Sequence, residues 1–181
     1  MSYDIALLPR IGAERLEDTI ARLPLDEDCD LDPKLVAGWR DLENNARRVV
    51  RGLRTTSLDP SCHELTDDRT GITVSAEHYV TVSIPFWYDG DQRLEMLTTL
   101  LRLATQLEAD TGLAGHDLQV KRWLADGVTP AEAAAAYQLG RDTIAEPQQH
   151  RPAADSGRMG HGIIRFFSWS LDQRRRKRGS T

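Results

Sequence analysis

Three consecutive side chains near the middle of the chain carry the groups needed for nucleophilic catalysis. Cys62, His63 and Glu64 supply a thiol, an imidazole and a carboxylate, as in a cysteine nucleophile with its base. Neighbouring residues of a strand point to opposite faces of the sheet, so these three cannot act together on one atom. A catalytic pair would need His78 or His116 to approach the thiol from another strand. We therefore predict that all three are ordinary strand residues.

A second group of chemistry-bearing side chains is acidic. Residues 26–32, DEDCDLD, hold five acids, three of them at the first, third and fifth positions of an EF-hand loop. Position six is Pro33 where a glycine is required, and position twelve is Trp39 where an acid is required, which excludes an EF-hand. We expect a solvated loop that binds a basic partner or, weakly, a divalent ion. Its candidate partner-binding residues are Asp26, Glu27, Asp28, Asp30 and Asp32.

Common catalytic and cofactor motifs are missing from the sequence. His63 and Glu64 could begin the zinc protease motif HExxH. Its second histidine would stand at position 67, which is Asp67, so the motif is absent. The chain has no phosphate loop, dinucleotide-binding glycine pattern, nucleophile elbow or Cys-x-x-Cys pair. Its five histidines show no metal-ligand spacing. We predict a protein that is not an enzyme and uses no cofactor and no metal.

Charge is divided unevenly along the chain. From residue 151 to residue 181, eight Lys or Arg residues stand against two Asp residues, a balance of +6. Because the whole chain carries −5, residues 1–150 carry −11. Such an acidic body repels phosphate groups, so attraction to nucleic acid or an anionic membrane must come from the C-terminal segment or a local patch.

The C-terminal segment 163–181 joins an apolar-aromatic stretch, IIRFFSWSL, to a basic run. As a helix it would dock on the domain, lie on an anionic membrane, or stack its aromatic rings on single-stranded nucleic acid. The candidate partner-binding residues here are Phe166, Phe167 and Trp169. The candidate bases for nucleic acid or membrane are Arg165, Arg174, Arg175, Arg176, Lys177 and Arg178.

Residues 120–144, VKRWLADGVTPAEAAAAYQLGRDTI, follow the residue order of a helix-turn-helix unit. Such a unit would turn at Leu139 and would add Lys121, Arg122 and Arg141 to the candidate nucleic-acid contacts. Gln138 replaces the usual turn glycine, and acids balance the bases of this segment. One Ala-rich capped helix that packs on the domain is the competing prediction.

Hydrophobic spacing predicts the elements of the N-terminal half. Residues 2–8 form a strand that ends at Pro9, and residues 11–23 form a helix. Apolar residues recur three and four apart over residues 35–53, behind an N-cap at Asp32 and a proline at the first helical position. This pattern predicts a long helix that buries Trp39 against a sheet.

The rest of the chain is predicted to form a meander followed by helices. Turn residues 55–61 precede three strands, at 62–66, 71–76 and 79–87. A helix at 91–110, a short strand at 116–120, a helical turn at 123–127 and a capped helix at 129–146 follow. We divide the chain into a domain at 1–120, a helical extension at 121–146, a linker at 147–162 and the segment 163–181.

Three stretches resemble a loose set of small uncharacterised bacterial proteins. In that set an opening MSYD strand precedes an IPYW-like strand, a helix and a TG-x(3)-YDPQ-like end. Residues 2–5, 84–87 and 111–119 match these features, with His116 in place of the aromatic residue and Leu118 in place of the proline. Some members resemble toxin-immunity proteins, so the resemblance implies a binding role and carries over no catalytic residue.

These patterns predict an α+β fold, a two-layer sandwich in which two long amphipathic helices cover a mostly antiparallel sheet, with a helical and partly disordered C-terminal extension. With two cysteines and no export signal, we expect a cytoplasmic protein. Its predicted role is to bind a protein partner without catalysis, as an immunity-like or regulatory module. The alternatives are a nucleic-acid-binding regulator that uses residues 120–151 and the basic tail, or peripheral attachment to an anionic membrane through residues 163–178.

Overall fold

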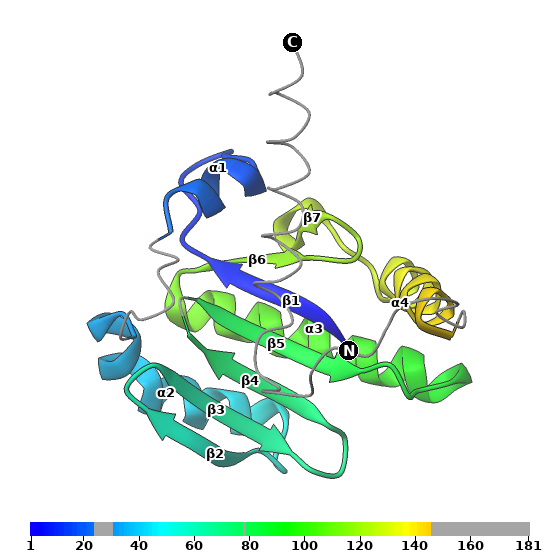
Figure 1. The fold of residues 1–181 in the computed structure, drawn as a ribbon, viewed down its shortest axis with the longest axis horizontal. Coiled ribbons are helices and arrows are strands. Elements are labelled where there is room, and N and C mark those ends of the chain that lie inside the picture. Colours follow the sequence, from blue (N-terminus) through cyan, green and yellow to red (C-terminus); the bar gives the residue numbers. More distant parts are fainter. Residues whose placement is uncertain (24–30, 78, 146–181) are drawn as a thin grey trace, which may run out of the picture. The chain divides into compact units, whose positions relative to one another are not determined.

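Alternating apolar residues along the chain build an antiparallel sheet. The structure, a computed structural model, describes residues 1–23, 31–77 and 79–145. Within these residues seven strands pair in the order β2-β3-β4-β5-β1-β6-β7 (Figure 1). Their bounds are β1 Ser2–Leu8, β2 Arg54–Asp59, β3 Cys62–Asp67, β4 Ile72–Ala76, β5 Val80–Pro85, β6 Ala114–Asp117 and β7 Arg122–Trp123. The predicted α+β class is confirmed, and so are the first strand and the three-strand meander.

Helices cover both faces of this sheet unequally. Three long helices, α2, α3 and α4, pack on one face, and the short helix α1 packs on the other (Figure 1). The helical bounds are α1 Leu16–Ala21, α2 Pro33–Val49, α3 Gly90–Thr111, the 3-10 turn η1 Leu124–Asp126 and α4 Pro130–Ala145. Where the sequence predicted two covering helices, α4 adds a third, since Ala133 and Tyr137 belong to the same core as α2 and α3. Ser2–Ala145 accordingly form one compact unit.

The central strand β1 shows how the core is divided. Tyr3, Ile5 and Leu7 alternate toward the long helices, whereas Ala6 and Leu8 face the opposite side and pack with Trp123. These five of the seven side chains of β1 are at most 1% exposed. Burial on both faces accounts for the continuous apolar stretch that Pro9 closes.

Local signals set the helix ends. Asp32 caps α2, and its Oδ1 accepts a hydrogen bond from the Lys34 amide at 2.8 Å. Gly112 ends α3 with a left-handed φ of 68°. Thr129 and Glu132 form the predicted capping box at the start of α4, with side-chain to amide distances of 3.3 and 3.0 Å.

The predicted turn at residues 55–61 is wrong, because Arg54–Asp59 form the edge strand β2. An edge strand that is open to solvent needs no apolar alternation, so its polar sequence resembles a loop. A shift of register between Thr55 and Ser57 marks a β-bulge in it.

Two helix predictions are also corrected. In the stretch 11–23 only Leu16–Ala21 are helical, since Gly12 has a φ of 58°, a left-handed conformation that interrupts a helix. In the stretch 123–127, Trp123 pairs with His116 as part of β7, which leaves η1 as a single 3-10 turn. Cross-strand pairing there outweighs the local helical pattern.

Candidate interaction surface

The end of β5 runs into three consecutive aromatic residues, Phe86, Trp87 and Tyr88. Successive side chains of an extended chain point in opposite directions, so all three cannot enter one core. Phe86 packs against the ring of Tyr137 at a centroid distance of 4.8 Å. Trp87 turns outward and stays 62% exposed. The sequence prediction assigned it no role, although the run of three aromatic residues was the signal that one of them would face solvent.

The exposed indole of Trp87 rests on the backbone at the start of β4. A Cβ atom placed on Gly71 would lie 2.7 Å from Cζ2 of Trp87 and 2.9 Å from Cγ of Pro85. Gly71 also has a left-handed φ of 63°. Glycine is therefore required here both by the backbone conformation and by the close approach of the ring.

Hydrogen bonds hold the backbone on both sides of Trp87. The Tyr137 hydroxyl donates to the Pro85 carbonyl at 2.7 Å and accepts from the Tyr88 amide at 2.9 Å. The Tyr88 hydroxyl donates to the Thr70 carbonyl at 2.5 Å. Trp87 is consequently exposed and yet fixed, and we name the set Gly71, Pro85, Trp87, Tyr88 and Asp89 the Trp87 surface.

An ion pair borders the Trp87 surface. Arg141 of α4 pairs with Asp89 and donates to the Tyr88 carbonyl at 3.2 Å. Arg141 was a predicted nucleic-acid contact, but in the structure its charge is matched by a carboxylate.

The sheet separates the side chains of Cys62 and His63, which the sequence predicted to be ordinary strand residues. His63 turns toward the long helices, where its ring lies 5.1 Å from that of Trp39. Burial, together with the charges of Glu77, Glu64 and Asp59, raises the pKa of the Cys62 thiol to about 11. A thiol with so high a pKa is protonated at neutral pH and is not activated as a nucleophile.

His116 and Asp117 are likewise separated by their strand, β6. The Asp117 carboxylate accepts a hydrogen bond from the Tyr3 hydroxyl at 2.5 Å and two more from the amides of Gln119 and Val120, at 3.0 and 2.8 Å. It thereby shapes the β6–β7 hairpin. His116 packs on the other face, with its ring 4.9 Å from that of Trp123. Burial lowers the pKa of His116 to about 4, so the imidazole is neutral at physiological pH.

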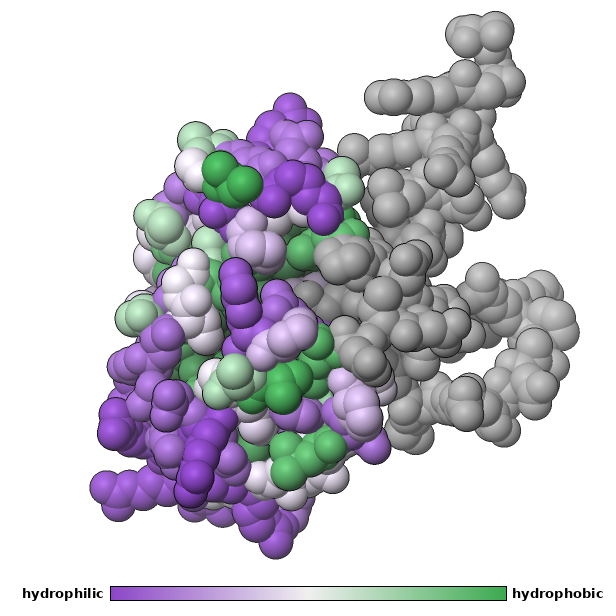
Figure 2. All heavy atoms as spheres, turned by 90° about the vertical axis from the view of Figure 1, so that its left-hand side faces the viewer, coloured by the Kyte–Doolittle hydropathy of each residue, from purple (hydrophilic) through white to green (hydrophobic). Residues whose placement is uncertain are grey.

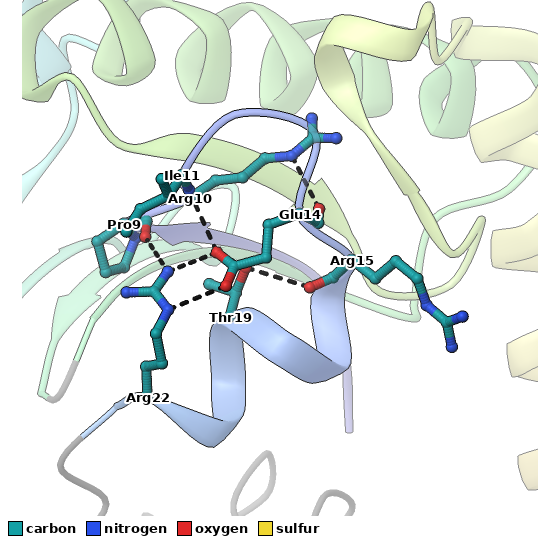
Figure 3. Close-up of polar contacts among 7 residues, drawn as sticks. All are labelled: Pro9, Arg10, Ile11, Glu14, Arg15, Thr19 and Arg22. Carbon is teal, nitrogen blue, oxygen red and sulfur yellow. Dashed lines mark hydrogen bonds and ion pairs between the residues drawn. The ribbon is translucent and has the colours of Figure 1, made fainter.

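Glu14 organises the loop that leads into α1 (Figure 3). Its carboxylate accepts hydrogen bonds from Arg22 at 2.5 and 3.0 Å, from the Ile11 amide at 3.3 Å and from the Thr19 hydroxyl at 3.2 Å. Arg22 holds the pKa of Glu14 at about 2. Arg10 donates to the Glu14 carbonyl at 3.0 Å (Figure 3). Its guanidinium also lies over the Trp123 ring, 4.4 Å from the ring centroid. The hydrogen bonds hold the loop and α1 together, and the contact between Arg10 and Trp123 joins the loop to β7.

The helix-turn-helix interpretation of residues 120–144 is wrong. α4 is a continuous helix of 16 residues that passes through Leu139, where the turn was required. Lys121 and Arg122 lie in the β6–β7 hairpin, and Arg122 pairs with Glu132 at 2.7 Å. The competing prediction, a capped helix that packs on the domain, is confirmed.

Of the candidate acids, Asp32 is the N-cap of α2 and is exposed. The remaining candidates, the predicted linker and the segment 163–181 lie outside the described residues. These candidates are Asp26, Glu27, Asp28, Asp30, Arg165, Phe166, Phe167, Trp169, Arg174, Arg175, Arg176, Lys177 and Arg178.

Searches of the structure and of known proteins give three further findings. Among residues 1–23, 31–77 and 79–145, no group of three or more His, Cys, Asp or Glu side chains is arranged to hold a metal ion. No helix in the same residues is long and apolar enough to cross a membrane. No family model, curated protein or solved structure matches the chain. The resemblance to the bacterial set therefore stays a prediction.

Proposed function

We propose that this chain is a non-catalytic module that binds a protein partner through the Trp87 surface. The observation that carries the proposal is Trp87 itself, a large aromatic side chain that is 62% exposed and rests on Gly71 and Pro85. Tryptophan, tyrosine and arginine dominate the binding energy of protein interfaces. A ring that is already fixed loses little conformational entropy on binding.

The surroundings of Trp87 define the chemistry of this partner. It offers an apolar recess for the indole, with charged groups of both signs around it that complement Asp89 and Arg141. Desolvated aromatic anchors surrounded by a polar rim are typical of protein interfaces. An immunity-like or regulatory interaction module fits this description. The acidic loop and the C-terminal aromatic residues remain predicted additional contacts.

A role without catalysis is supported by the separation of the reactive groups. Cys62 and His63 face opposite sides of β3, and the thiol has a pKa of about 11. His116 and Asp117 face opposite sides of β6, and the Asp117 carboxylate is engaged by Tyr3 and two backbone amides. Neither pair has the geometry of a nucleophile with its base.

Affinity capture with two matched variants tests the proposal. The wild-type chain, Trp87→Ala and Leu139→Ala are immobilised and exposed to a lysate of the source organism; Leu139 on α4 is a control because it is 71% exposed. We expect a protein that is retained by the wild type and by Leu139→Ala but lost with Trp87→Ala. Titration calorimetry with that purified protein should give the same order. Equal retention by all three chains would reject the Trp87 surface.

Binding to nucleic acid or an anionic membrane is a second candidate function, which the +6 balance of residues 151–181 favours. Each phosphate contact that is lost reduces the slope of log affinity against log salt by about 0.9 on duplex DNA. Neutralising the five bases 174–178 to Gln should therefore flatten the salt dependence of binding to DNA, RNA or anionic vesicles. Equal affinity and an equal slope for the neutralised variant would contradict this second function.

We also propose a cytoplasmic location. Cys62 is a free thiol in the described part of the chain, as is usual in a reducing compartment. Cell fractionation tests this point, and recovery of the protein from a secreted or membrane fraction would contradict it.

A further inference from the structure

Among the described residues, no strand pairs with the outer edge of β2. The described sheet ends at β2 on one side and at β7 on the other, and β7 has only two residues, whereas β2 has six. Five of the six β2 residues are exposed. A strand at the edge of a sheet presents backbone N–H and C=O groups that can pair with another strand. β2 is therefore the one long edge of the described sheet that is available for such pairing.

The bulge in β2 makes the strand symmetric about its midpoint. Arg54 and Asp59 pair with Thr66 and Cys62 of β3, so both point away from the long helices. Thr55 and Leu58 pair with Leu65 and His63, so both point toward them. Thr56 and Ser57, at the bulge, share the outer face, where their hydroxyls bond to Glu64 and Asp59. Read from either end of β2, the side chains therefore point away from the long helices, toward them, and away from them again.

When two β2 strands pair in antiparallel orientation, residues that lie opposite each other therefore point to the same side of the joined sheet. About a twofold axis between Thr56 and Ser57, Arg54 of each copy lies opposite Asp59 of the other, and Thr55 lies opposite Leu58. Opposite charges at directly facing positions stabilise a strand pair. Arg54 also pairs with Asp68 of its own chain, and its five N–H donors are enough for both carboxylates.

The flank beside this edge carries apolar side chains as well. Leu58 is 62% exposed, and Val36 of α2 is 45% exposed. The Thr55 hydroxyl donates to Glu43 of α2 at 2.6 Å, which puts that side of α2 next to β2. Val36 precedes Glu43 by seven residues, so it lies on the same side of the helix. A neighbouring copy would cover both apolar side chains.

The face that carries the β2–β3 turn and the N-terminal end of α2 is mostly hydrophilic, with separate hydrophobic patches (Figure 2). Backbone pairing with complementary charges suits the exposed, largely polar sequence of β2. We propose that two copies of this chain associate through β2, as an antiparallel, isologous pair that continues the sheet from one protomer into the other. This inference concerns a surface separate from Trp87 and does not rest on the proposed function.

Charge reversal on the full chain tests the pair. Arg54→Asp places two acids opposite each other in a homodimer, and Asp59→Arg places two bases there. Each single variant should weaken dimerisation about tenfold or more, as measured by sedimentation equilibrium over a wide range of concentration. The double variant Arg54→Asp with Asp59→Arg should dimerise like the wild type.

Mixing the two single variants gives the most specific outcome. In the mixed dimer the acid introduced by Arg54→Asp would face the base introduced by Asp59→Arg, and the native Arg54 of one copy would face the native Asp59 of the other. A heterodimer should therefore form where neither homodimer does. Arg15→Asp beside α1 is the matched control, since it makes the same charge change on a side chain that is 78% exposed and far from β2 (Figure 1). Circular dichroism establishes that each variant is folded.

Three results would overturn the proposal. They are a wild-type chain that stays monomeric at all concentrations, dimerisation that is indifferent to both reversals, and folded single variants that fail to associate when mixed. If Trp87→Ala loses partner capture but dimerises like the wild type, the Trp87 surface and the β2 edge act independently.

Discussion

The indole of Trp87 lies against Gly71 so closely that a methyl group on Gly71 would come within 2.7 Å of the ring. Trp87 is the second residue after β5 and Gly71 directly precedes β4, and the contact keeps a largely exposed tryptophan in one position. The conformation of the turn before β4 therefore determines how the candidate interaction surface is presented.

Substitution of Gly71 by alanine should disturb both stability and Trp87. The left-handed φ of 63° costs a non-glycine residue about 1–2 kcal/mol, and the displaced ring adds to this cost. We expect Gly71→Ala to destabilise the fold by about 1–3 kcal/mol in urea unfolding and to change the tryptophan fluorescence.

Gly127→Ala is the control for this substitution. Gly127 also has a left-handed φ, of 82°, but a Cβ atom there meets nothing within 4 Å. The Gly127→Ala variant should lose stability through backbone strain alone, and its Trp87 fluorescence should stay like that of the wild type. Equal spectra and equal affinity for the captured partner in both variants would contradict the contact between Gly71 and Trp87.

Tyr3→Phe should expose how much the buried hydrogen bond to Asp117 contributes. The substitution leaves one carboxylate oxygen of a fully buried aspartate without its 2.5 Å donor. We expect a loss of about 1–3 kcal/mol in the free energy of unfolding. A double-mutant cycle with Asp117→Asn measures the coupling between the two side chains, and additive effects would show that they do not interact.

His116 predicts a dependence of stability on pH. Its pKa is about 4 in the folded protein against an ordinary value of 6.5, so below pH 6.5 the unfolded chain binds a proton that the folded chain does not. Stability that is fully present above pH 6.5 should therefore fall as the pH drops toward 4, by up to about 3 kcal/mol. Glu17, Arg10 and Asp126 are the charged groups that face the imidazole.

The variant His116→Phe isolates this effect. The Nδ1 atom of His116 has no hydrogen-bond partner among the described residues, so an apolar ring of similar shape can replace the imidazole. The difference in unfolding free energy between wild type and variant should change between pH 6.5 and 4 and stay constant above pH 7.5. A constant difference over the whole range would reject a depressed pKa for His116.

Trp39→Ala should be among the most destabilising substitutions in α2. Trp39 is 4% exposed and lies in the core between α2 and β3. Truncation of a buried tryptophan costs about 3–5 kcal/mol. Val36→Ala on the same helix, at a side chain that is 45% exposed, should change stability by less than about 1 kcal/mol. Similar melting temperatures for the two variants would contradict the burial of Trp39.

The sequence alone determined those elements whose signals are local. The apolar spacing of α2, its N-cap Asp32 and the Thr129–Glu132 capping box act within a few residues of the chain, and the structure contains all three. The alternation along β5 likewise predicted a strand with one face in the core. Such signals are visible in sequence because each is satisfied by its own neighbours.

Only the tertiary structure decided the features that depend on a distant neighbour. β2 has no apolar alternation and exists as a strand because β3 pairs with it. Trp123 is in a strand and not in a helix because β6 and Arg10 hold it. Trp87 stays exposed because Phe86 takes the place beside Tyr137 while Gly71 admits the indole on the surface. In each case the deciding contact is made with another element of the fold, and the local hydrophobic pattern does not specify which contact forms.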